Sequence, residues 1–497
     1  MLKRNMQLLP GKVAIIYHDV RITFKELNET VNRIANALIA AGIKRGDRVG
    51  IVLPRIPELV MSFLAISKAG GIVVPINFEL KDEGVRDILI TISPRFIIVH
   101  KQFQEPLKRA IPPGSNTVTI IVGEKDAGDC LYWKELLESG NPDEPAPEVD
   151  ENDVVYLNYT SGSTGNSRGA VTTHSNIYWN TFAAVNALRL TSEDVHLCMF
   201  APFAHPHEIF ARPLYLGGTM VLLDNIYPKS IAKTISSNGV TCMMGLAPMY
   251  ETLLEAVEHK TYDLGSLRVP ESGGMHTRTD LIQRFERKIG VPILPVWGST
   301  ETTGIALANT PGESLVYSSV GKPCPTYEAR ILDEKGEDVA TGEIGELIFR
   351  GPAVVSGYYE EGQGNSSFRN GWYYSGDLAR KDIDGNFFFI DRKSGMMKVA
   401  GLKVYPMEVE LALMEHPDIK EAAVIASKDK LRGEVPKAII VTRNGNILTD
   451  KEVIEFCRGK LPNYKIPKIV EFSENLPKIG SGKINKKELA MEELLKR

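Results

Sequence analysis

The stretch Thr160-Ser-Gly-Ser-Thr-Gly-Asn-Ser-Arg168-Gly169 is the part of this sequence that says most about its fold. It follows Val154–Tyr159, an apolar segment typical of a buried strand, and it concentrates hydroxyl groups and glycines. Glycines let backbone N–H groups approach phosphate oxygens closely, and hydroxyls add further donors. Arg168 adds a fixed positive charge. The stretch therefore predicts a phosphate-binding loop, and a flexible Ser/Gly linker is the alternative.

Helical and strand patterns alternate around this loop. Thr23–Glu26 has the pattern of a capping box, and apolar residues at helical spacing follow it. Val49–Leu53 and Ile72–Val74 are short apolar runs of the buried-strand type. This alternation predicts an α/β fold with a mostly parallel sheet. Short strands and many glycines then predict a β-rich subdomain over residues 319–389.

The last hundred residues have an α/β pattern of their own. A helix is predicted to begin near Pro406, and a capping box at Thr449–Glu452 predicts another. Glu421–Ala426 and Ala438–Thr442 are predicted strands. Since 497 residues are too many for one ordinary core, we expect a separate C-terminal domain that begins near Asp391.

Composition narrows the class of protein. Hydrophobic residues make up 43% and charged residues 24%, which is typical of a globular enzyme. The net charge of −4 provides no basic field for nucleic acid, so we expect no nucleic-acid partner. Five scattered cysteines without a CxxC pair argue against a disulfide framework or a zinc site. No apolar run reaches the roughly 18–20 residues of a membrane span, so we expect a cytoplasmic protein without a transmembrane segment.

Further motifs follow the loop in a fixed order. They are Ser272-Gly273-Gly274, Trp297-Gly298-Ser-Thr300-Glu301, Gly371-Trp372-Tyr-Tyr-Ser-Gly-Asp377, Asp391-Arg392, Lys398-Val-Ala-Gly401 and Leu476-Pro-Lys-Ile-Gly-Ser-Gly-Lys483. With the loop, these motifs resemble the adenylate-forming (AMP-binding) superfamily, and most closely its acyl-CoA synthetases. The resemblance covers nearly the whole chain. Arg168 is a departure, because the family loop usually ends in Pro-Lys-Gly.

The resemblance implies a specific domain organisation. Residues 1–391 would form a large domain of two α/β subdomains and a β-rich subdomain, which holds the ATP and acyl sites. Residues 392–497 would form a small mobile α/β domain that carries Lys398 and Lys483. Ser394 would be the hinge residue, where the family more often has Asp or Lys.

The resemblance also implies a nucleotide site. Glu301 would be the magnesium ligand, which suits a hard cation that prefers carboxylate and phosphate oxygens. Asp377 and Arg392 would reach the ribose. The residues expected to bind ATP or AMP are Thr160, Ser161, Gly162, Ser163, Thr164, Gly165, Arg168, Gly273, Gly274, Trp297, Gly298, Thr300, Asp377 and Arg392.

Other family positions would act on the acid and on CoA. Lys483 matches the catalytic lysine, and Thr300 and His205 would also be catalytic, with His205 near the acyl carboxylate. Lys398 and Gly401 would serve thioester formation. The expected acyl pocket includes His205, His207 and Gly298. The His207-Glu208 pair would read a polar group on the acid or only line the pocket wall.

The implied activity is that of an AMP-forming acid–CoA ligase, with ATP, magnesium and CoA as co-substrates or cofactor. No residue clearly plays the part of the bulky Trp that shortens the pocket of acetate-specific relatives. A medium-chain, alicyclic or aromatic acid is therefore expected, with a role in fatty acid metabolism. The alternatives are an acyl- or aryl-AMP ligase that loads a carrier protein and a nucleotide-binding regulatory protein with degraded catalysis. A homodimer is also considered.

Overall fold

The computed structural model describes residues 1–78, 80, 82–125, 130–161, 167–259, 262–359, 367–443, 448–478 and 484–495. For residues 160, 161, 167 and 259 it describes the backbone alone. The chain divides into two compact units. Unit 1 is Met1–Ala329 with Phe349–Tyr373, and unit 2 is Arg330–Ile348 with Tyr374–Arg497. The division proposed above, 1–391 and 392–497, stays a prediction.

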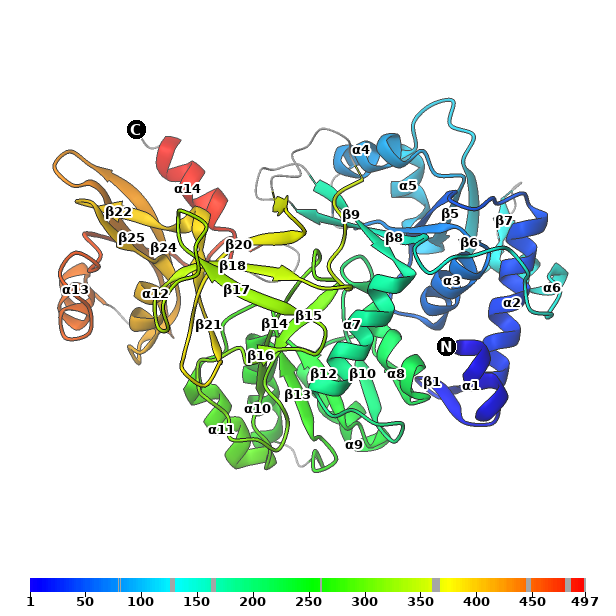
Figure 1. Cartoon of the computed structure of the whole chain (residues 1–497), viewed down its shortest axis with the longest axis horizontal. Helices are drawn as coiled ribbons and strands as arrows, with labels where there is room; N and C mark the ends of the chain where they lie inside the picture. The colour runs from blue at the N-terminus through cyan, green and yellow to red at the C-terminus, as the bar shows by residue number, and fades with distance from the viewer. Residues whose placement is uncertain are drawn as a thin grey trace. The chain divides into compact units, whose positions relative to one another are not determined.

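The first sheet of unit 1 contains the strand that leads into the Ser/Gly-rich loop. Its seven strands have the order β7-β6-β5-β3-β4-β8-β9, and only β8 and β9 pair in antiparallel fashion (Figure 1). The strands are β3 (Arg48–Val52), β4 (Ile72–Pro75), β5 (Phe96–His100), β6 (Val118–Val122), β7 (Leu131–Tyr132), β8 (Val154–Ser161) and β9 (Ser167–Thr173). The predicted strands at residues 49–53, 72–74 and 154–159 are confirmed.

The second sheet of unit 1 has the order β16-β15-β14-β13-β12-β10-β11-β1-β2. The strands β1, β11, β10, β12, β13 and β14 pair in parallel. The nine strands are β1 (Val13–Tyr17), β2 (Val20–Thr23), β10 (Val195–Cys198), β11 (Thr219–Leu222), β12 (Cys242–Gly245), β13 (Val269–Ser272), β14 (Leu294–Ser299), β15 (Gly304–Ala308) and β16 (Lys322–Pro323). The predicted α/β fold with mostly parallel sheet is confirmed.

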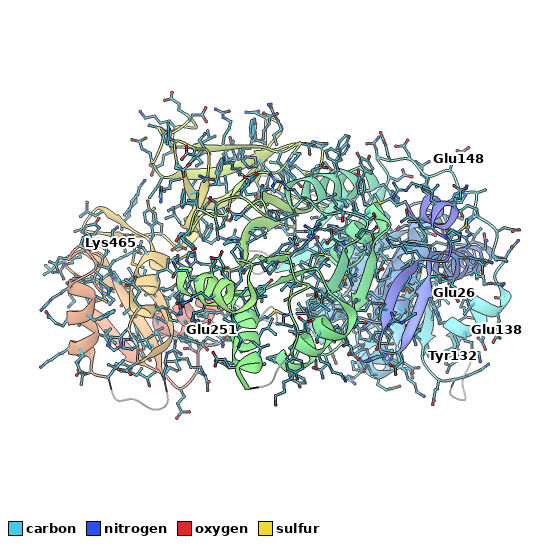
Figure 2. The ribbon with its side chains drawn as sticks, turned by 90° about the horizontal axis from the view of Figure 1, so that it is seen from below. Glu26, Tyr132, Glu138, Glu148, Glu251 and Lys465 are labelled. Atoms are coloured by element: carbon cyan, nitrogen blue, oxygen red, sulfur yellow. The ribbon has the colours of Figure 1, made fainter. Side chains whose placement is uncertain are left out.

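Helices alternate with these strands. They are α1 (Leu2–Leu8), α2 (Phe24–Ala40), α3 (Pro57–Lys68), α4 (Asp82–Ile92), α5 (Gln104–Ala110), α6 (Trp133–Ser139), α7 (His174–Ala187), α8 (Ala211–Leu216), α9 (Pro228–Asn238), α10 (Ala247–His259) and α11 (Thr279–Ile289). The predicted capping box begins α2, where the Thr23 side chain accepts from the Glu26 backbone and Glu26 accepts from the Thr23 backbone (Glu26 is labelled in Figure 2). Glu251 of α10, also labelled there, pairs with Arg284 of α11 at 2.6 Å.

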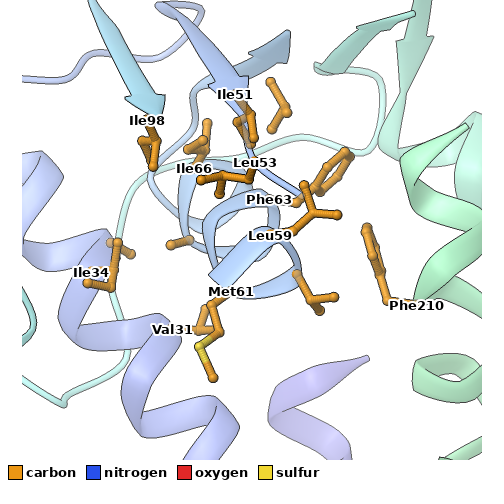
Figure 3. Close-up of a cluster of buried hydrophobic side chains, with 14 of the residues drawn as sticks. Val31, Ile34, Ile51, Leu53, Leu59, Met61, Phe63, Ile66, Ile98 and Phe210 are labelled. Carbon is orange, nitrogen blue, oxygen red and sulfur yellow. The ribbon is translucent and has the colours of Figure 1, made fainter. Parts of the chain in front are cut away.

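One cluster of buried apolar side chains includes residues from both sheets of unit 1. Figure 3 shows α3 within this cluster, with Val31 and Ile34 of α2 on one side and Ile98 of β5 nearby. Phe63 of α3 contacts Phe210, which precedes α8, with ring centroids 4.8 Å apart. The same ring lies 5.6 Å from that of Tyr156 in β8. Since β8 leads into the loop, this core fixes the strand that presents it.

Unit 2 contains a five-stranded sheet in the order β23-β22-β25-β24, with β26 beside β25. Another five-stranded sheet has the order β17-β18-β20-β19, with β21 beside β20, and its strand β19 belongs to unit 1. The strands are β17 (Glu328–Leu332), β18 (Gly345–Arg350), β19 (Phe368–Arg369), β20 (Trp372–Lys381), β21 (Phe387–Arg392), β22 (Met397–Val399), β23 (Leu402–Val404), β24 (Ile419–Asp429), β25 (Gly433–Thr442) and β26 (Ile469–Phe472). The predicted β-rich segment is therefore confirmed.

The helices of unit 2 are α12 (Pro406–Met414), α13 (Asp450–Arg458) and α14 (Lys486–Leu495). The predicted capping box at Thr449 and Glu452 begins α13. Lys465, labelled in Figure 2, donates to Glu408 in the first turn of α12 at 2.6 and 2.7 Å. Among the described residues, no helix combines the length and apolar character needed to cross a bilayer.

Candidate active site

The two ends of the Ser/Gly-rich stretch lie in the paired strands β8 and β9. The register pairs Tyr159 with Gly169 and Thr160 with Arg168. A Cβ atom at Gly169 would lie 3.1 Å from the Tyr159 ring, so the glycine lets the two strands pass closely. The predicted residues Gly162, Ser163, Thr164 and Gly165 lie outside the described residues, as do the side chains of Thr160 and Ser161.

Arg168 stacks on a tyrosine that sequence reasoning missed. Its guanidinium carbon lies 4.0 Å from the centroid of the Tyr358 ring, within the range of a cation–π contact. Tyr358 is held beside β9 because it forms a bridge with Ala170, and Tyr359 N donates to Gly169 O at 2.8 Å. The backbone at Tyr358 and Tyr359 therefore lies alongside β9 of the β8–β9 hairpin.

Glu301 follows β14 and is held by two tyrosine hydroxyls. Tyr358 donates to Oε1 at 2.6 Å, and Tyr373 donates to Oε2 at 3.0 Å. Glu301 is only 9% exposed. Burial, and then the charge and hydrogen bond of Glu301, raise the pKa of Tyr358, so its hydroxyl stays protonated and donates. Both carboxylate oxygens thus have a fixed direction.

This carboxylate fits a magnesium ion that arrives with a triphosphate. Magnesium usually takes one or two protein carboxylates and completes its shell with phosphate oxygens and water. Each oxygen of Glu301 has a second lone pair beyond its tyrosine hydrogen bond. Within the described ranges, no group of three or more His, Cys, Asp or Glu residues could bind a metal by itself. A single protein carboxylate is compatible with a site completed by substrate.

The β14–β15 hairpin that carries Glu301 is tightly packed. A Cβ at Gly298 would lie 2.4 Å from Gly304 O and 2.9 Å from Ile305 N. Trp297 stacks on Phe349, with centroids 4.5 Å apart and an interplanar angle of 12°. The predicted nucleotide and acyl-pocket residue Gly298 thus has a backbone role that its motif alone did not indicate.

Thr300 and His205, both predicted to be catalytic, lie together. Thr300 Oγ1 and His205 Nε2 are 3.4 Å apart. His205 begins the short 3-10 helix Pro206–Ile209 with φ 52° and ψ 52°, a left-handed conformation that is costly for a residue other than glycine. Such a strained residue persists only where the surrounding structure holds it, and residues of this kind cluster at functional sites.

His207 and Glu208 have partners in the protein interior. His207 Nδ1 lies 2.8 Å from the Tyr156 hydroxyl, and burial lowers the pKa of His207 to about 3, so the ring is neutral. Arg212 lies between Glu208 and Glu271, at 2.9 Å from each. Although burial opposes charge there, the two glutamates raise the pKa of Arg212. The Glu208–Arg212 ion pair could have been predicted from the sequence, because the two residues are four positions apart. The contact with Glu271 could not, because that residue is distant in the sequence.

Gly273 and Gly274 follow β13. A Cβ at Gly273 would lie 2.5 Å from the Met244 side chain, and Gly274 has a φ of +74°. Ser272 Oγ accepts from Thr277 Oγ1 at 2.7 Å. The positive φ of Gly274 thus favours glycine in the predicted adenine-side loop, whereas a Cβ at Gly273 would first meet the flexible end of the Met244 side chain.

Asp377 and Arg392 face each other in unit 2. They are directly opposite in the β20–β21 pair, and Arg392 Nε lies 2.8 Å from Asp377 Oδ1. The Asp377 side chain is 4% exposed, whereas that of Arg392 is 62% exposed. Ser375 Oγ accepts from the Asp377 backbone at 3.1 Å. The structure thus brings the two predicted ribose residues together.

The segment after Arg392 contains the predicted hinge. Asp391 accepts from Arg392 N and from Met407 N, both at 2.7 Å, and so joins β21 to the first turn of α12. Ser394 lies in the exposed 3-10 turn Lys393–Gly395.

The predicted thioester segment is an exposed hairpin of β22 and β23. Ala400 and Gly401 at its tip have φ of 48° and 85°, as in a type I′ turn. Lys398 is exposed, and its backbone N donates to Glu434 at 2.8 Å. The predicted catalytic residue Lys483 lies outside the described residues.

Family models match most of the chain. The model of the AMP-binding enzyme matches residues 2–359, and that of the AMP-binding enzyme C-terminal domain matches residues 408–483. The chain therefore belongs to the AMP-binding enzyme family, which confirms the resemblance found in the sequence.

The relatives include a feruloyl-CoA synthase and a fatty-acid–CoA ligase. The chain is 33% identical over 495 residues to a feruloyl-CoA synthase of Amycolatopsis sp, which covers 98% of this chain and 97% of that protein. It is 31% identical over 517 residues to a long-chain-fatty-acid–CoA ligase of Bacillus subtilis, at 97% and 92% coverage.

Solved structures agree over nearly the full length. The anthranilate CoA ligase AuaEII in complex with anthranoyl-AMP superposes with a TM-score of 0.92 at 29% identity, covering 99% of this chain and 96% of that chain. The o-succinylbenzoate CoA synthetase MenE of Bacillus subtilis, in complex with ATP and magnesium, has a TM-score of 0.87 at 27% identity and 98% coverage of both chains. The predicted fold class is confirmed.

Proposed function

We propose that the protein is an ATP-dependent, AMP-forming acid–CoA ligase. A carboxylic acid and ATP would give acyl-AMP and pyrophosphate, and CoA would then give acyl-CoA and AMP. The observation that carries the proposal is Glu301, a buried carboxylate oriented by two tyrosines beside the Arg168 end of the loop hairpin. The family supports it, because named relatives form feruloyl-CoA and fatty acyl-CoA, and the AuaEII complex contains anthranoyl-AMP.

The first half-reaction brings two anions together, so the site must neutralise charge and align the nucleophile. Magnesium, when bound, supplies Lewis-acid neutralisation of the phosphates. Glu301 would hold the ion, and backbone and hydroxyl donors of Thr160–Gly169 would bind the phosphates. Lys483 would contact both the acid carboxylate and the α-phosphate.

The acid would lie near Thr300 and His205. Their 3.4 Å contact and the left-handed backbone of His205 support a site that fixes a carboxylate by hydrogen bonds. Trp297, Gly298, Gly273 and Gly274 would form the adenine side of the nucleotide site.

Asp377 is proposed to accept hydrogen bonds from the ribose hydroxyls, and Arg392 to donate to the ribose. Their ion pair, with 2.8 Å between Arg392 Nε and Asp377 Oδ1, joins the two side chains across the β20–β21 pair. When ribose binds, its hydroxyls would share this carboxylate with Arg392.

Thioester formation is proposed to follow a rotation about Ser394. Lys483 would leave the site, and the Lys398–Gly401 hairpin would enter it beside CoA. An exposed 3-10 turn with glycine as its last residue can absorb such a change of backbone angles.

The acid is proposed to be aromatic or a fatty acid of medium length, or alicyclic, rather than acetate. The relatives, named for feruloyl-CoA and for long-chain fatty acids, favour an aromatic acid or a fatty acid and do not select medium length. A cytoplasmic location and a homodimer remain predictions that need measurement, by cell fractionation and by light scattering.

An acid panel tests the proposal. Purified protein would be assayed with aromatic, alicyclic and C2–C16 acids for acid-dependent pyrophosphate–ATP exchange, and then for acyl-CoA and AMP after CoA is added. We expect exchange and thioester with the same acid. Exchange without thioester would favour loading of a carrier protein, and no exchange with any acid would favour a nucleotide-binding regulator. Glu301→Gln is the matched variant, because it keeps the side-chain shape and removes the charge that holds magnesium.

A further inference from the structure

Tyr358 connects two residues that have separate proposed roles. The face of its ring lies under the Arg168 guanidinium at 4.0 Å, and its hydroxyl donates to Glu301 at 2.6 Å. The other Glu301 oxygen accepts from Tyr373 at 3.0 Å. One aromatic ring is thus in contact with both the cation at the end of the loop and the carboxylate proposed to hold magnesium.

The surroundings of this ring restrict its movement. Phe368 lies edge-on to it, with centroids 5.7 Å apart, and also contacts Tyr373 at 5.3 Å. On the backbone side, Tyr358 forms a bridge with Ala170 in β9. The ring is therefore held from two directions, and its hydroxyl can act as a fixed donor.

The two contacts of Tyr358 also strengthen each other. A cation over the ring face withdraws electron density, which makes the phenolic hydroxyl a better donor to a carboxylate. Arg168 Nε is buried and has no hydrogen-bond partner within the described ranges, which suits a phosphate oxygen brought by the substrate. An arginine at this position can lay its planar guanidinium on the ring and donate from the edge of that plane, whereas a lysine presents a compact point charge without a planar face.

We propose that Tyr358 is a positioning residue that couples Arg168 to Glu301, so that the loop cation and the metal-binding carboxylate are held in one arrangement. This inference rests on the proposed function, since it assumes that a metal–ATP complex binds here. It also accounts for the arginine that replaces the usual lysine of the loop, because the ring of Tyr358 provides a surface for a planar cation.

The test uses the full chain and Mn²⁺ as the probe for the metal. Binding of Mn²⁺·ATP is measured by electron paramagnetic resonance, and binding of ATP with EDTA by calorimetry. Tyr358→Phe removes only the hydroxyl, and we expect about tenfold weaker Mn²⁺·ATP binding, as for one lost hydrogen bond to a charged group. ATP affinity in EDTA should stay within about twofold of the wild type, because that hydrogen bond serves the metal ligand. The control is Tyr359→Phe, at the neighbouring tyrosine that is 36% exposed, which should change neither value.

A double-mutant cycle tests the coupling directly. Arg168→Lys should weaken Mn²⁺·ATP binding by a factor about threefold larger in the wild type than in Tyr358→Leu, where the stacking surface is gone. Two effects that simply multiply would overturn the inference. Wild-type affinity of Tyr358→Phe for Mn²⁺·ATP would also overturn it. An equal loss of ATP affinity with Mn²⁺ and with EDTA would do the same, because a merely structural role predicts that result. Wild-type protein that binds no Mn²⁺·ATP would instead overturn the proposed function itself.

Discussion

Gly298→Ala tests whether Gly298 is needed for the close approach of β14 to β15 or only for the shape of the acyl pocket. The new Cβ would lie 2.4 Å from Gly304 O and 2.7 Å from Gly304 C. Real Cβ atoms essentially never come closer than 3.0 Å, so the paired strand must retreat by the difference between 3.0 and 2.4 Å, or about 0.6 Å. The obstacle is backbone of the facing strand, which cannot rotate away. We therefore expect a loss of about 3 kcal/mol, at the upper end of the usual cost of overpacking.

Urea unfolding, followed by tryptophan fluorescence, measures this loss, since the neighbouring Trp297 reports on the hairpin. The control is Gly11→Ala, because a Cβ there meets no heavy atom within 4 Å, and its effect should be within about 0.5 kcal/mol. Displacement of the hairpin moves Thr300 and Glu301, so exchange activity should fall for every acid alike. If Gly298→Ala kept wild-type stability and changed only which acids are used, the backbone reasoning would be refuted.

Three more predictions concern other parts of the site. Asp377→Ala should raise the KM for ATP about tenfold or more through the lost ribose hydrogen bonds, and an unchanged KM in steady-state assays would remove Asp377 from the nucleotide site. Ser394→Pro should spare pyrophosphate exchange and slow thioester formation, whereas an equal loss in both assays would place the hinge elsewhere. Burial lowers the pKa of His207 to about 3 from 6.5, so protons favour the unfolded chain. Stability should thus fall by up to about 1.4 kcal/mol per pH unit as the pH drops below 6.5. Urea unfolding at pH 7, 6 and 5 gives the free energy of unfolding at each pH. This free energy should change less with pH in His207→Asn than in the wild type, and an equal change in both would contradict a neutral buried ring.

Features set by short-range interactions could be predicted from the sequence. The capping boxes at Thr23 and Thr449 form as expected, because each needs only residues three positions apart. The apolar strand before the loop also forms, because a continuous apolar run of that length favours a buried strand. Ordered motifs then indicated the family, which the family models confirm.

Features that depend on distant residues could not be predicted in this way. Tyr358 and Tyr373 donate to Glu301 from 57 and 72 positions further along the chain, and Tyr358 is brought there by its bridge to Ala170 in β9. The left-handed backbone of His205 could not be predicted either, because a residue other than glycine adopts it only uncommonly. Motif matching assigns residues one at a time, so it missed both the tyrosines and the close approach of Gly298 to its partner strand.

The fate of one oxygen atom tests the central claim most directly. In an acyl-adenylate mechanism, a carboxylate oxygen of the acid attacks the α-phosphate and remains on AMP when CoA takes the acyl group. With the preferred acid labelled with ¹⁸O in its carboxylate, mass spectrometry of a single turnover should find one ¹⁸O atom in AMP and none in pyrophosphate. Formation of acyl-CoA with unlabelled AMP, or with the label in a phosphate other than that of AMP, would contradict activation of the acid as an adenylate.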